Sequence, residues 1–268
     1  MTILILGGAG RTGARIHRRL STTGVPTRLA SRRTGFDWDQ PDTWSDAVHG
    51  TTAAYVCFTP DLAFPGVPEK MRDLGQLAAA ANLERLVLLS GRGEEGARMS
   101  ESALREGGVP TTVLRCSWFQ QNFSEHFLTG PVRRGFLHLP APDVPEAFVD
   151  LDDVADAAVQ ALTCTIPEDA TYELSGPELL TFAQTAAILT DACKRQVTYL
   201  SVDVPTFVAD LAQDGVPADE AEPLAHLFTE ILDGRNASLT AGVENILGRP
   251  ASSFSAYARA TAMSGVWS

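Results

Sequence analysis

The sequence predicts an α/β fold, built on a doubly wound parallel sheet and continued by a small, mostly helical C-terminal part. Three observations support this prediction: an apolar run at Thr2–Leu6, a glycine-rich turn directly after it, and a regular alternation of apolar runs with helical segments as far as Leu114. Strands that alternate with helices are typical of a parallel sheet with helices on both faces.

The elements can be placed by the period of their apolar residues and by the turn residues between them. Strands of the sheet are expected at residues 2–6, 27–31, 53–58, 85–89 and 111–114, with a further short strand just before Asp37. Helices between them are expected at residues 14–20, 43–49, 69–81 and 98–106. After Arg115 we expect strands at residues 136–139, 171–174 and 197–202, and helices at residues 150–162, 182–194, 205–214, 218–232, 241–247 and 252–262.

The composition is that of a globular protein with a substantial core, because 44% of the 268 residues are apolar. No stretch approaches the ~18 apolar residues that cross a bilayer, so no membrane association is expected. The apolar start of the chain runs into glycines rather than a cleavage site, and we interpret it as a strand. The cysteines are scattered and form no CxxC; they are Cys57, Cys116, Cys164 and Cys193. We therefore expect reduced thiols in a cytoplasmic protein.

The charge is unevenly distributed along the chain. The formal net charge of −12 argues against nucleic-acid binding. Residues 1–35 nevertheless contain seven arginines and neither Asp nor Glu. A local positive field in an acidic protein indicates a small anionic ligand near the amino terminus. The alternative, a solvated basic helix face, accounts for Arg15, Arg18 and Arg19 but not for the pair Arg32–Arg33.

Three glycines form a phosphate-binding pattern, GxxGxxG, between the first expected strand and the first expected helix. Gly7 allows the tight turn out of the strand, Gly10 lets backbone N–H groups approach a pyrophosphate, and Gly13 lets the helix pack close to the sheet. The pyrophosphate then lies at the positive end of the helix dipole. The pattern predicts a dinucleotide site in a Rossmann-type domain, with Arg11 and Thr12 as further contacts; a glycine-rich turn without a ligand is the alternative.

The end of the second expected strand distinguishes between the two nicotinamide cofactors. Proteins that bind NAD usually carry an Asp or Glu about 20 residues after the glycine motif, where it binds the ribose hydroxyls. This chain has Ser31, Arg32 and Arg33 at that place. A hydroxyl and two guanidiniums suit a 2′-phosphate, and no carboxylate repels it. The sequence therefore predicts NADP(H) as the cofactor.

Further cofactor contacts are expected at the carboxyl ends of the other strands, where ligands bind in such folds. They are Asp37 and Trp38 beside the adenine, Phe58, Thr59 and Pro60 beside the ribose and nicotinamide, and Ser90 and Gly91 at the end of the next strand.

The usual catalytic pair of short-chain dehydrogenases, Tyr-x-x-x-Lys, is absent from the chain, whose two lysines are Lys70 and Lys194. A tyrosine activated by a neighbouring lysine is therefore not available as an acid or base. Ser90 is a candidate proton donor, and the alternative is a serine that contacts the cofactor or the backbone. The histidines show no metal-ligand spacing, so no metal is expected. Helix capping explains the aspartates at 150, 152 and 153 better than an acidic site does.

The segment from Cys116 to Phe123 follows the last strand of the first half and combines aromatic rings with amides. Such side chains can stack on a flat substrate and orient a carbonyl or imine. We expect Trp118, Phe119, Asn122 and Phe123 to contact the substrate. An amphipathic helix that belongs to the core is the alternative.

These motifs resemble those of the NmrA-like branch of atypical short-chain dehydrogenases/reductases. The resemblance rests on TILILGGAGRTG at the start, LASRR at the second strand, LLSG at 88–91, LRCSWFQQNFSE at 114–125, FVDLDDVADAA at 148–158 and YELSGP at 172–177. The FDW at 36–38 is most similar to the ergot-alkaloid-type reductases and their actinobacterial relatives. The resemblance covers nearly the whole chain, and it implies an NADP-type cofactor bound by Gly7, Gly10, Gly13, Ser31 and Arg32.

The resemblance also limits what can be expected of the function, because members of this family differ. Some reduce quinones, imines or activated alkenes, and others sense the redox state without turnover. We expect an NADPH-dependent oxidoreductase that transfers hydride to an activated C=N, C=C or quinone group of a small flat substrate, with secondary metabolism as the expected setting. The alternative is a non-catalytic NADP(H)-sensing regulator. We expect residues 1–150 to form the NADP-binding domain, with later segments returning to it, residues 151–268 the substrate-binding part, and the protein to be a monomer or homodimer.

Overall fold

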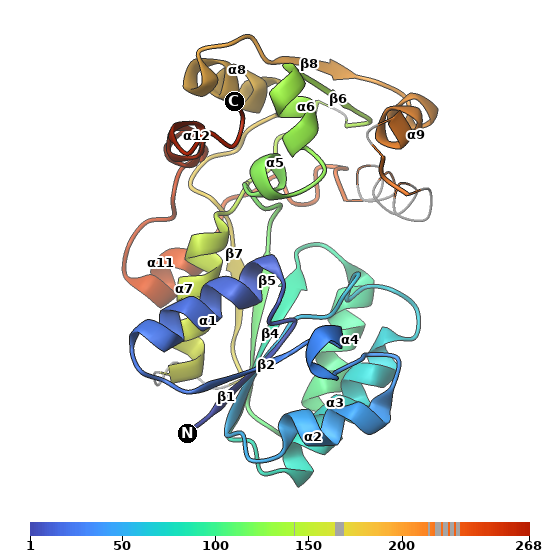
Figure 1. Cartoon of the computed structure of the whole chain (residues 1–268), viewed down its shortest axis with the longest axis vertical. Coiled ribbons are helices and arrows are strands. Elements are labelled where there is room, and N and C mark those ends of the chain that lie inside the picture. Colours follow the sequence, from blue (N-terminus) through green and yellow to red (C-terminus); the bar gives the residue numbers. More distant parts are fainter. Residues whose placement is uncertain are drawn as a thin grey trace. The chain divides into compact units, whose positions relative to one another are not determined.

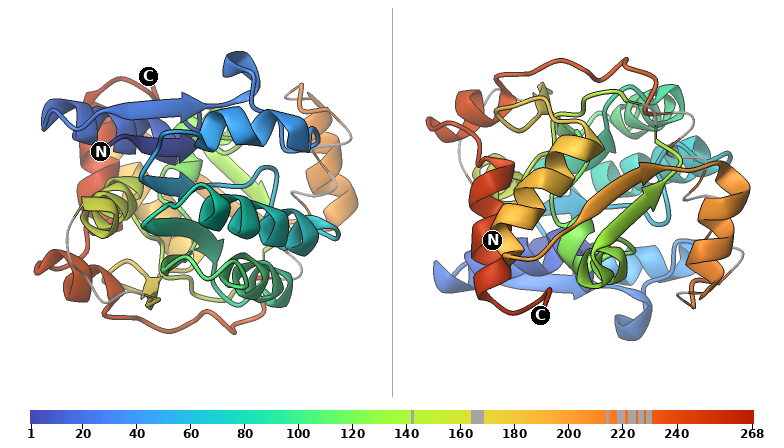
Figure 2. Two further views of the ribbon diagram at one scale, coloured as in Figure 1. Left: turned by 90° about the horizontal axis from the view of Figure 1, so that it is seen from below. Right: turned by 90° about the horizontal axis from the view of Figure 1, so that it is seen from above.

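The computed structural model describes residues 1–141, 143–163, 169–213, 215–217, 221, 225, 228 and 231–268 (Figures 1 and 2). By their contacts these residues divide into two compact units. Unit 1 comprises Met1–Cys116, Leu151–Leu174 and Ala241–Arg249, and unit 2 comprises Ser117–Asp150, Ser175–Thr240 and Pro250–Ser268. The chain thus passes several times between the units, and the domain boundary at residue 150 stays a prediction.

Unit 1 is built on a six-stranded sheet in the order β2-β1-β3-β4-β5-β7, in which every pairing is parallel. Its strands are β1 (Ile3–Leu6), β2 (Thr27–Ala30), β3 (Ala53–Val56), β4 (Arg85–Gly91), β5 (Thr111–Cys116) and β7 (Thr171–Leu174). This confirms the predicted doubly wound fold. All residues of β1 and β3 are buried, as expected for strands that are covered on both faces.

Helices cover the sheet of unit 1 on both faces. They are α1 (Arg11–Thr22), α2 (Trp44–Val48), α3 (Val67–Ala80), α4 (Glu95–Arg105), α7 (Leu151–Thr163) and α11 (Gly242–Leu247). Figure 1 shows α1 and α7 on one side of the strands and α3 and α4 on the other. Helices α3 and α4 pack so closely that a Cβ on Gly75 would lie 2.3 Å from the carbonyl oxygen of Leu104.

The strand order reverses between β1 and β3, because β1 is joined to β2 on one side and lies beside β3 on the other. In open α/β sheets, ligands bind outside the carboxyl ends of the strands at such a reversal. The residues that follow β1, β2, β3 and β4 therefore define the edge of unit 1 at which a ligand is expected.

One predicted strand of the first half is wrong. Before Asp37 the chain forms a 3-10 helix, Arg32–Thr34, instead of a short strand. The Thr34 hydroxyl accepts a hydrogen bond from the Ser31 backbone N–H at 2.9 Å, and Gly35 follows with a φ of +87°. These local bonds close a tight turn, which leaves no extended residues for a strand.

Unit 2 holds a two-stranded parallel sheet of β6 (Phe136–Leu139) and β8 (Thr198–Ser201). Its helices are α5 (Asn122–Glu125), α6 (Thr129–Arg134), α8 (Phe182–Cys193), α9 (Val204–Gln213) and α12 (Phe254–Met263). Aromatic rings of Phe123, Phe148, Phe182 and Phe254 form the centre of its core. Most residues of the helix predicted at 218–232, like Cys164, lie outside the described residues. Among the helices that the structure describes, none has the length and apolar character needed to cross a membrane.

Candidate functional site

The glycine-rich loop between β1 and α1 closes tightly on itself. Gly7 has a φ of +78°, which only glycine adopts readily, and its N–H donates to the Ala30 carbonyl at 3.1 Å. A Cβ on Gly13 would lie 2.4 Å from the Gly7 carbonyl oxygen, so the helix can approach the loop only with glycine there. Gly10 caps α1 with no side-chain hydrogen bond. The first N–H groups of the helix can therefore bind an anion, as the sequence predicts.

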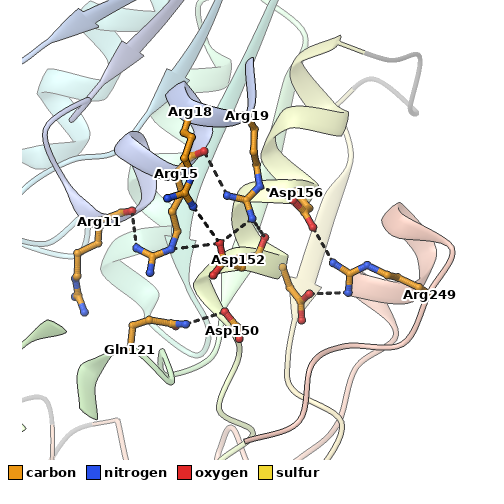
Figure 3. Close-up of polar contacts among 10 residues, drawn as sticks. Arg11, Arg15, Arg18, Arg19, Gln121, Asp150, Asp152, Asp156 and Arg249 are labelled. Carbon is orange, nitrogen blue, oxygen red and sulfur yellow. Dashed lines mark hydrogen bonds and ion pairs between the residues drawn. The ribbon is translucent and has the colours of Figure 1, made fainter. Parts of the chain in front are cut away.

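The two other predicted loop residues differ in their environment. Thr12 is buried, and its Oγ1 lies 4.0 Å from the Cys57 Sγ at the end of β3. This hydroxyl is thus directed into unit 1 rather than to its surface. Arg11 stands at the first position of α1, and Figure 3 shows its side chain directed away from the aspartates of α7. Of the two, Arg11 is therefore the partly exposed residue.

Ser31, Arg32 and Arg33 follow β2 at the same edge of the sheet. Both arginines are exposed, and within the described part of the chain neither guanidinium forms a hydrogen bond or an ion pair. Arg28, on β2 itself, is different, because its guanidinium donates to the backbone carbonyls of Asp46, Ala47 and His49. The charges of Arg32 and Arg33 are therefore available to an anionic ligand.

Of the arginines on α1 that the sequence assigned to a solvated basic face, Arg18 is exposed, whereas Arg15 and Arg19 are mostly buried and paired. Arg19 bonds Asp152 at 2.7 Å and Asp156 at 2.5 Å, and Arg15 lies 3.5 Å from Asp152 (Figure 3). Arg249 bonds Asp156 from the other side at 2.8 Å. Asp152 and Asp156 therefore serve as ion-pair partners between α1, α7 and the end of α11. Most of the positive charge of α1 is neutralised within unit 1.

The residues predicted beside the adenine form a compact cluster. The Trp38 ring lies 4.8 Å from that of Phe36 and 5.0 Å from that of Phe58, centroid to centroid. The Asp37 carboxylate accepts hydrogen bonds from the Asp39 N–H and the Gln40 amide. Asp37 therefore shapes this turn, while Trp38 and Phe58 offer a partly exposed aromatic surface.

Thr59 and Pro60, which follow Phe58, are exposed beyond the end of β3 and are joined by a cis peptide bond. They lie in the loop that leads from β3 towards α3. Their position at the carboxyl end of a central strand agrees with the edge at which a ligand is expected.

Ser90 is buried at the end of β4 and donates its hydroxyl hydrogen to Glu101 Oε1 at 2.6 Å. Arg115 on β5 binds the same carboxylate at 2.6 Å and 2.9 Å, and this hydrogen bond raises the pKa of Arg115. The only hydrogen of the Ser90 hydroxyl is thus already bound. This arrangement does not support Ser90 as a proton donor to substrate. Glu101 was not predicted, although an acidic residue within the apolar stripe of a helix is a signal for a buried partner.

A pair of carboxyl groups, Asp61 and Glu94, was also missed by sequence reasoning. Glu94 lies over the end of β4, since a Cβ on Gly91 would be 2.0 Å from its Oε1. Burial, and then the charge and hydrogen bond of Asp61, raise the pKa of Glu94 to about 7. The pair can therefore hold a proton near neutral pH. Acidic residues just after two adjacent strands are the signal that could have indicated it.

In unit 2 the predicted substrate residues have unequal exposure. Trp118 and Phe119 are partly exposed, and Asn122 is 9% exposed. Phe123 is 0% exposed, with ring contacts to Phe148 at 5.7 Å and to Phe254 at 5.1 Å. Because no part of its side chain reaches the surface, the structure places Phe123 in the core, where a substrate cannot contact it.

The polar side chains of this segment bind within unit 2. Gln120 donates to the carbonyls of Phe148 and Ser252, and Gln121 donates to Asp150 at 2.7 Å (Figure 3). The alternative for this segment was an amphipathic core helix. The structure has only the four-residue helix α5 there. The buried amides fix the backbone that carries Trp118 and Phe119.

Fold and loop together define a protein with a Rossmann-type fold. No family model matches the chain. Among curated proteins, it is 31% identical to the uncharacterized oxidoreductase YesF of Bacillus subtilis, over 97% of this chain and 95% of that protein. It is 30% identical to festuclavine dehydrogenase easG of Aspergillus fumigatus, over 95% of each. It is 29% identical to agroclavine dehydrogenase of Claviceps fusiformis, over 92% of this chain and 93% of that protein.

Solved structures agree in fold. Citrobacter sp. triphenylmethane reductase complexed with NADP(H) superposes with a TM-score of 0.81 at 18% identity, over 98% of this chain and all of that one. The Escherichia coli NADPH-dependent quinone oxidoreductase complexed with NADPH superposes with a TM-score of 0.77 at 21% identity, over 96% of this chain and 98% of that one. The chain belongs to the NmrA-like atypical short-chain dehydrogenases/reductases, in the oxidoreductase family that includes the festuclavine and agroclavine dehydrogenases.

Proposed function

We propose that the protein is an NADPH-dependent reductase that transfers hydride to an activated C=N, C=C or quinone group of a small flat substrate. The names of its relatives, festuclavine dehydrogenase and agroclavine dehydrogenase, support a role in secondary metabolism. The single observation that carries the cofactor preference is the pair of exposed guanidiniums at Arg32 and Arg33, which have no partner among the described residues. No carboxylate takes the place that binds the ribose hydroxyls of NAD.

The residues of unit 1 fit this cofactor. The loop from Gly7 to Gly13 leads into the start of α1, where the first N–H groups of the helix and its dipole would stabilise a pyrophosphate. Ser31 and Arg32 would hold the 2′-phosphate, with Arg33 adding to the positive field. Trp38 and Phe58 would border the adenine. The edge formed by Thr59, Pro60, Ser90 and Gly91 would receive the ribose and nicotinamide.

When it is bound, the nicotinamide supplies the hydride, and the protein contributes mainly position. The chain has no Tyr-x-x-x-Lys pair, so a strong acid for an unactivated ketone is missing. The substrate must therefore be electrophilic before it binds. The Ser90 hydroxyl is bound to Glu101, so where the product needs a proton, solvent or the protonated Glu94 carboxyl is the better source.

The substrate side of the proposal rests on unit 2. Trp118 and Phe119 are the partly exposed rings of the segment, and Asn122 adds an amide that can bind a carbonyl or imine. Aromatic faces favour a flat, conjugated ligand. We assign Phe123 to the support of these residues from within the core. A small molecule is therefore the expected partner, and a cytoplasmic monomer or homodimer the expected form.

The test is NADPH oxidation, followed at the absorbance band of the reduced nicotinamide, against a panel of iminium, enone and quinone compounds. We expect turnover with at least one of these classes and none with simple secondary alcohols and NADP⁺. Replacing Trp118 by Ala should raise the KM for an accepted substrate without changing the Kd for NADPH. Tight NADPH binding without turnover on any compound would contradict the reductase proposal and favour a nucleotide sensor.

A further inference from the structure

The Tyr55 side chain lies at the centre of the sheet of unit 1. On β3 it is in register with Ile5 of β1 and Val87 of β4, and none of its surface is exposed. Its hydroxyl oxygen, Oη, has no hydrogen-bond partner in the part of the chain that the structure describes. A buried hydroxyl without a partner has lost its bonds to water and gained nothing in return, which is unfavourable and uncommon in folded proteins.

The polar groups around this hydroxyl belong to the glycine loop and to the strand ends beneath it. Burial raises the pKa of Tyr55 well above its usual range, and the Cys57 thiol adds to the rise. A weak hydrogen-bond interaction with the Thr12 hydroxyl, outside regular hydrogen-bond geometry, opposes it. Thr12 stands in the first turn of α1, and Cys57 contacts the loop, since a Cβ on Gly7 would lie 3.1 Å from its carbonyl oxygen. Tyr55 therefore projects towards the underside of the proposed pyrophosphate cradle.

The Thr12 hydroxyl is poorly bonded as well. It donates to the Cys57 Sγ at 4.0 Å, which is a weak acceptor at the limit of hydrogen-bond distance. Two buried hydroxyls, on Tyr55 and Thr12, thus lie close to each other without a good bond between them. A small movement of the first turn of α1 would bring them into range, because Thr12 is carried by the same turn whose N–H groups would bind the pyrophosphate.

We propose that Tyr55 is a positioning residue for the pyrophosphate loop, whose hydroxyl bonds the Thr12 hydroxyl when a dinucleotide is bound. This inference rests on the proposed function. A dinucleotide that fixes the first turn of α1 stabilises the hydrogen bond between Tyr55 and Thr12. By thermodynamic linkage, this hydrogen bond in turn increases the affinity for the dinucleotide. Part of the affinity for the dinucleotide then comes from a bond that the ligand itself does not touch.

The test is Tyr55→Phe, which removes the hydroxyl and keeps the ring. Without nucleotide we expect the melting temperature to stay the same or to rise, because no bond is lost. The Kd values for NADPH and for NADH should both increase by about three- to tenfold, which corresponds to one neutral hydrogen bond. The KM for NADPH should rise while kcat is kept. Scanning calorimetry and isothermal titration calorimetry give both readouts, and Arg32→Ala is the contrasting variant that acts on NADPH alone.

Thr12→Val is a second variant, which removes the other hydroxyl of the proposed bond and keeps the proposal testable if the Tyr55 variant does not fold. It should weaken both cofactors by a similar factor, and adding Tyr55→Phe should cause no further loss, since one bond has already been removed. Unchanged Kd values in Tyr55→Phe, or fully additive losses in the double variant, would overturn the inference. If the wild-type protein binds neither cofactor, the proposed function itself has failed, which is a different result.

Discussion

The arginines near the amino terminus show how one residue type takes several roles. Arg19 is paired with two aspartates of α7, Arg28 binds carbonyls at the end of α2, and Arg32 is exposed after β2. Their side chains are identical, so the sequence could indicate a positive field but could not assign each charge to a partner. The assignment depends on which helix packs beside each arginine.

Replacing Arg32 by Ala should weaken NADPH binding by about 1–3 kcal/mol, the range for hydrogen bonds to charged groups, and NADH binding much less. The reason is that only NADPH carries the 2′-phosphate. Isothermal titration calorimetry with both cofactors measures the difference. Arg18→Ala is the matched control, because the Arg18 side chain is 70% exposed and lies 3.8 Å from Asp152 on another part of unit 1. Equal losses for the two cofactors in Arg32→Ala would refute the assignment.

Glu94 predicts a pH dependence of stability. Its pKa is raised to about 7, first by burial and then by Asp61, so its contribution to stability is fully present below the unfolded pKa and is lost as the pH rises through about 7. Glu94→Gln should therefore raise the melting temperature at pH 8 and change it little at pH 4. Differential scanning calorimetry at the two pH values measures this. Glu95→Gln, at an exposed neighbouring position, should show no such dependence, and a loss of stability at pH 8 in Glu94→Gln would contradict the account.

At the scale of elements, the pairing of α1 with α7 explains the aspartates that the sequence assigned to helix capping. Asp152 accepts a hydrogen bond from Arg19 at 2.7 Å, and Asp153 accepts one from Arg249 at 2.7 Å. Both stand in the first turn of α7, where the helix dipole also favours negative charge. These carboxylates therefore join three segments of unit 1 that are far apart in the sequence.

Replacing Arg19 by Met, which keeps the apolar stem and removes the charge, should lower the free energy of unfolding by about 1–2 kcal/mol. Arg19 bonds both Asp152 and Asp156 and is only 22% exposed, so salt should screen this contribution incompletely. Urea denaturation at low and high salt measures it. Arg18→Met, at the 70% exposed position, should change the free energy by less than about 0.5 kcal/mol. The account is contradicted if both variants behave alike.

At the scale of the whole molecule, the sequence predicted the parallel sheet because its strands are short apolar runs separated by helices with a clear period. Strands β6 and β7 begin and end at the predicted residues. The strand predicted just before Asp37 was wrong, because hydrogen bonds of the Thr34 side chain close a turn at Arg32–Thr34. Such local bonds do not change the period of the apolar residues, so the sequence pattern does not show them.

The candidate site was predictable to a similar degree. The glycine loop and the residues after β2 have a recognisable pattern, and the structure places them at one edge of unit 1. The bond of Ser90 to Glu101, the Asp61–Glu94 pair and the burial of Phe123 were not predictable. Each depends on contacts between residues distant in sequence, which no local pattern records.

The central claim is that the start of the chain binds a nicotinamide dinucleotide and prefers the one with a 2′-phosphate. Isothermal titration calorimetry of the folded wild-type protein with NADPH, and then with NADH, tests it most directly. We expect saturable one-site binding of NADPH and a Kd for NADH that is at least about tenfold higher, equivalent to 1.4 kcal/mol. Absence of binding heat with both cofactors, or tighter binding of NADH, would contradict the claim.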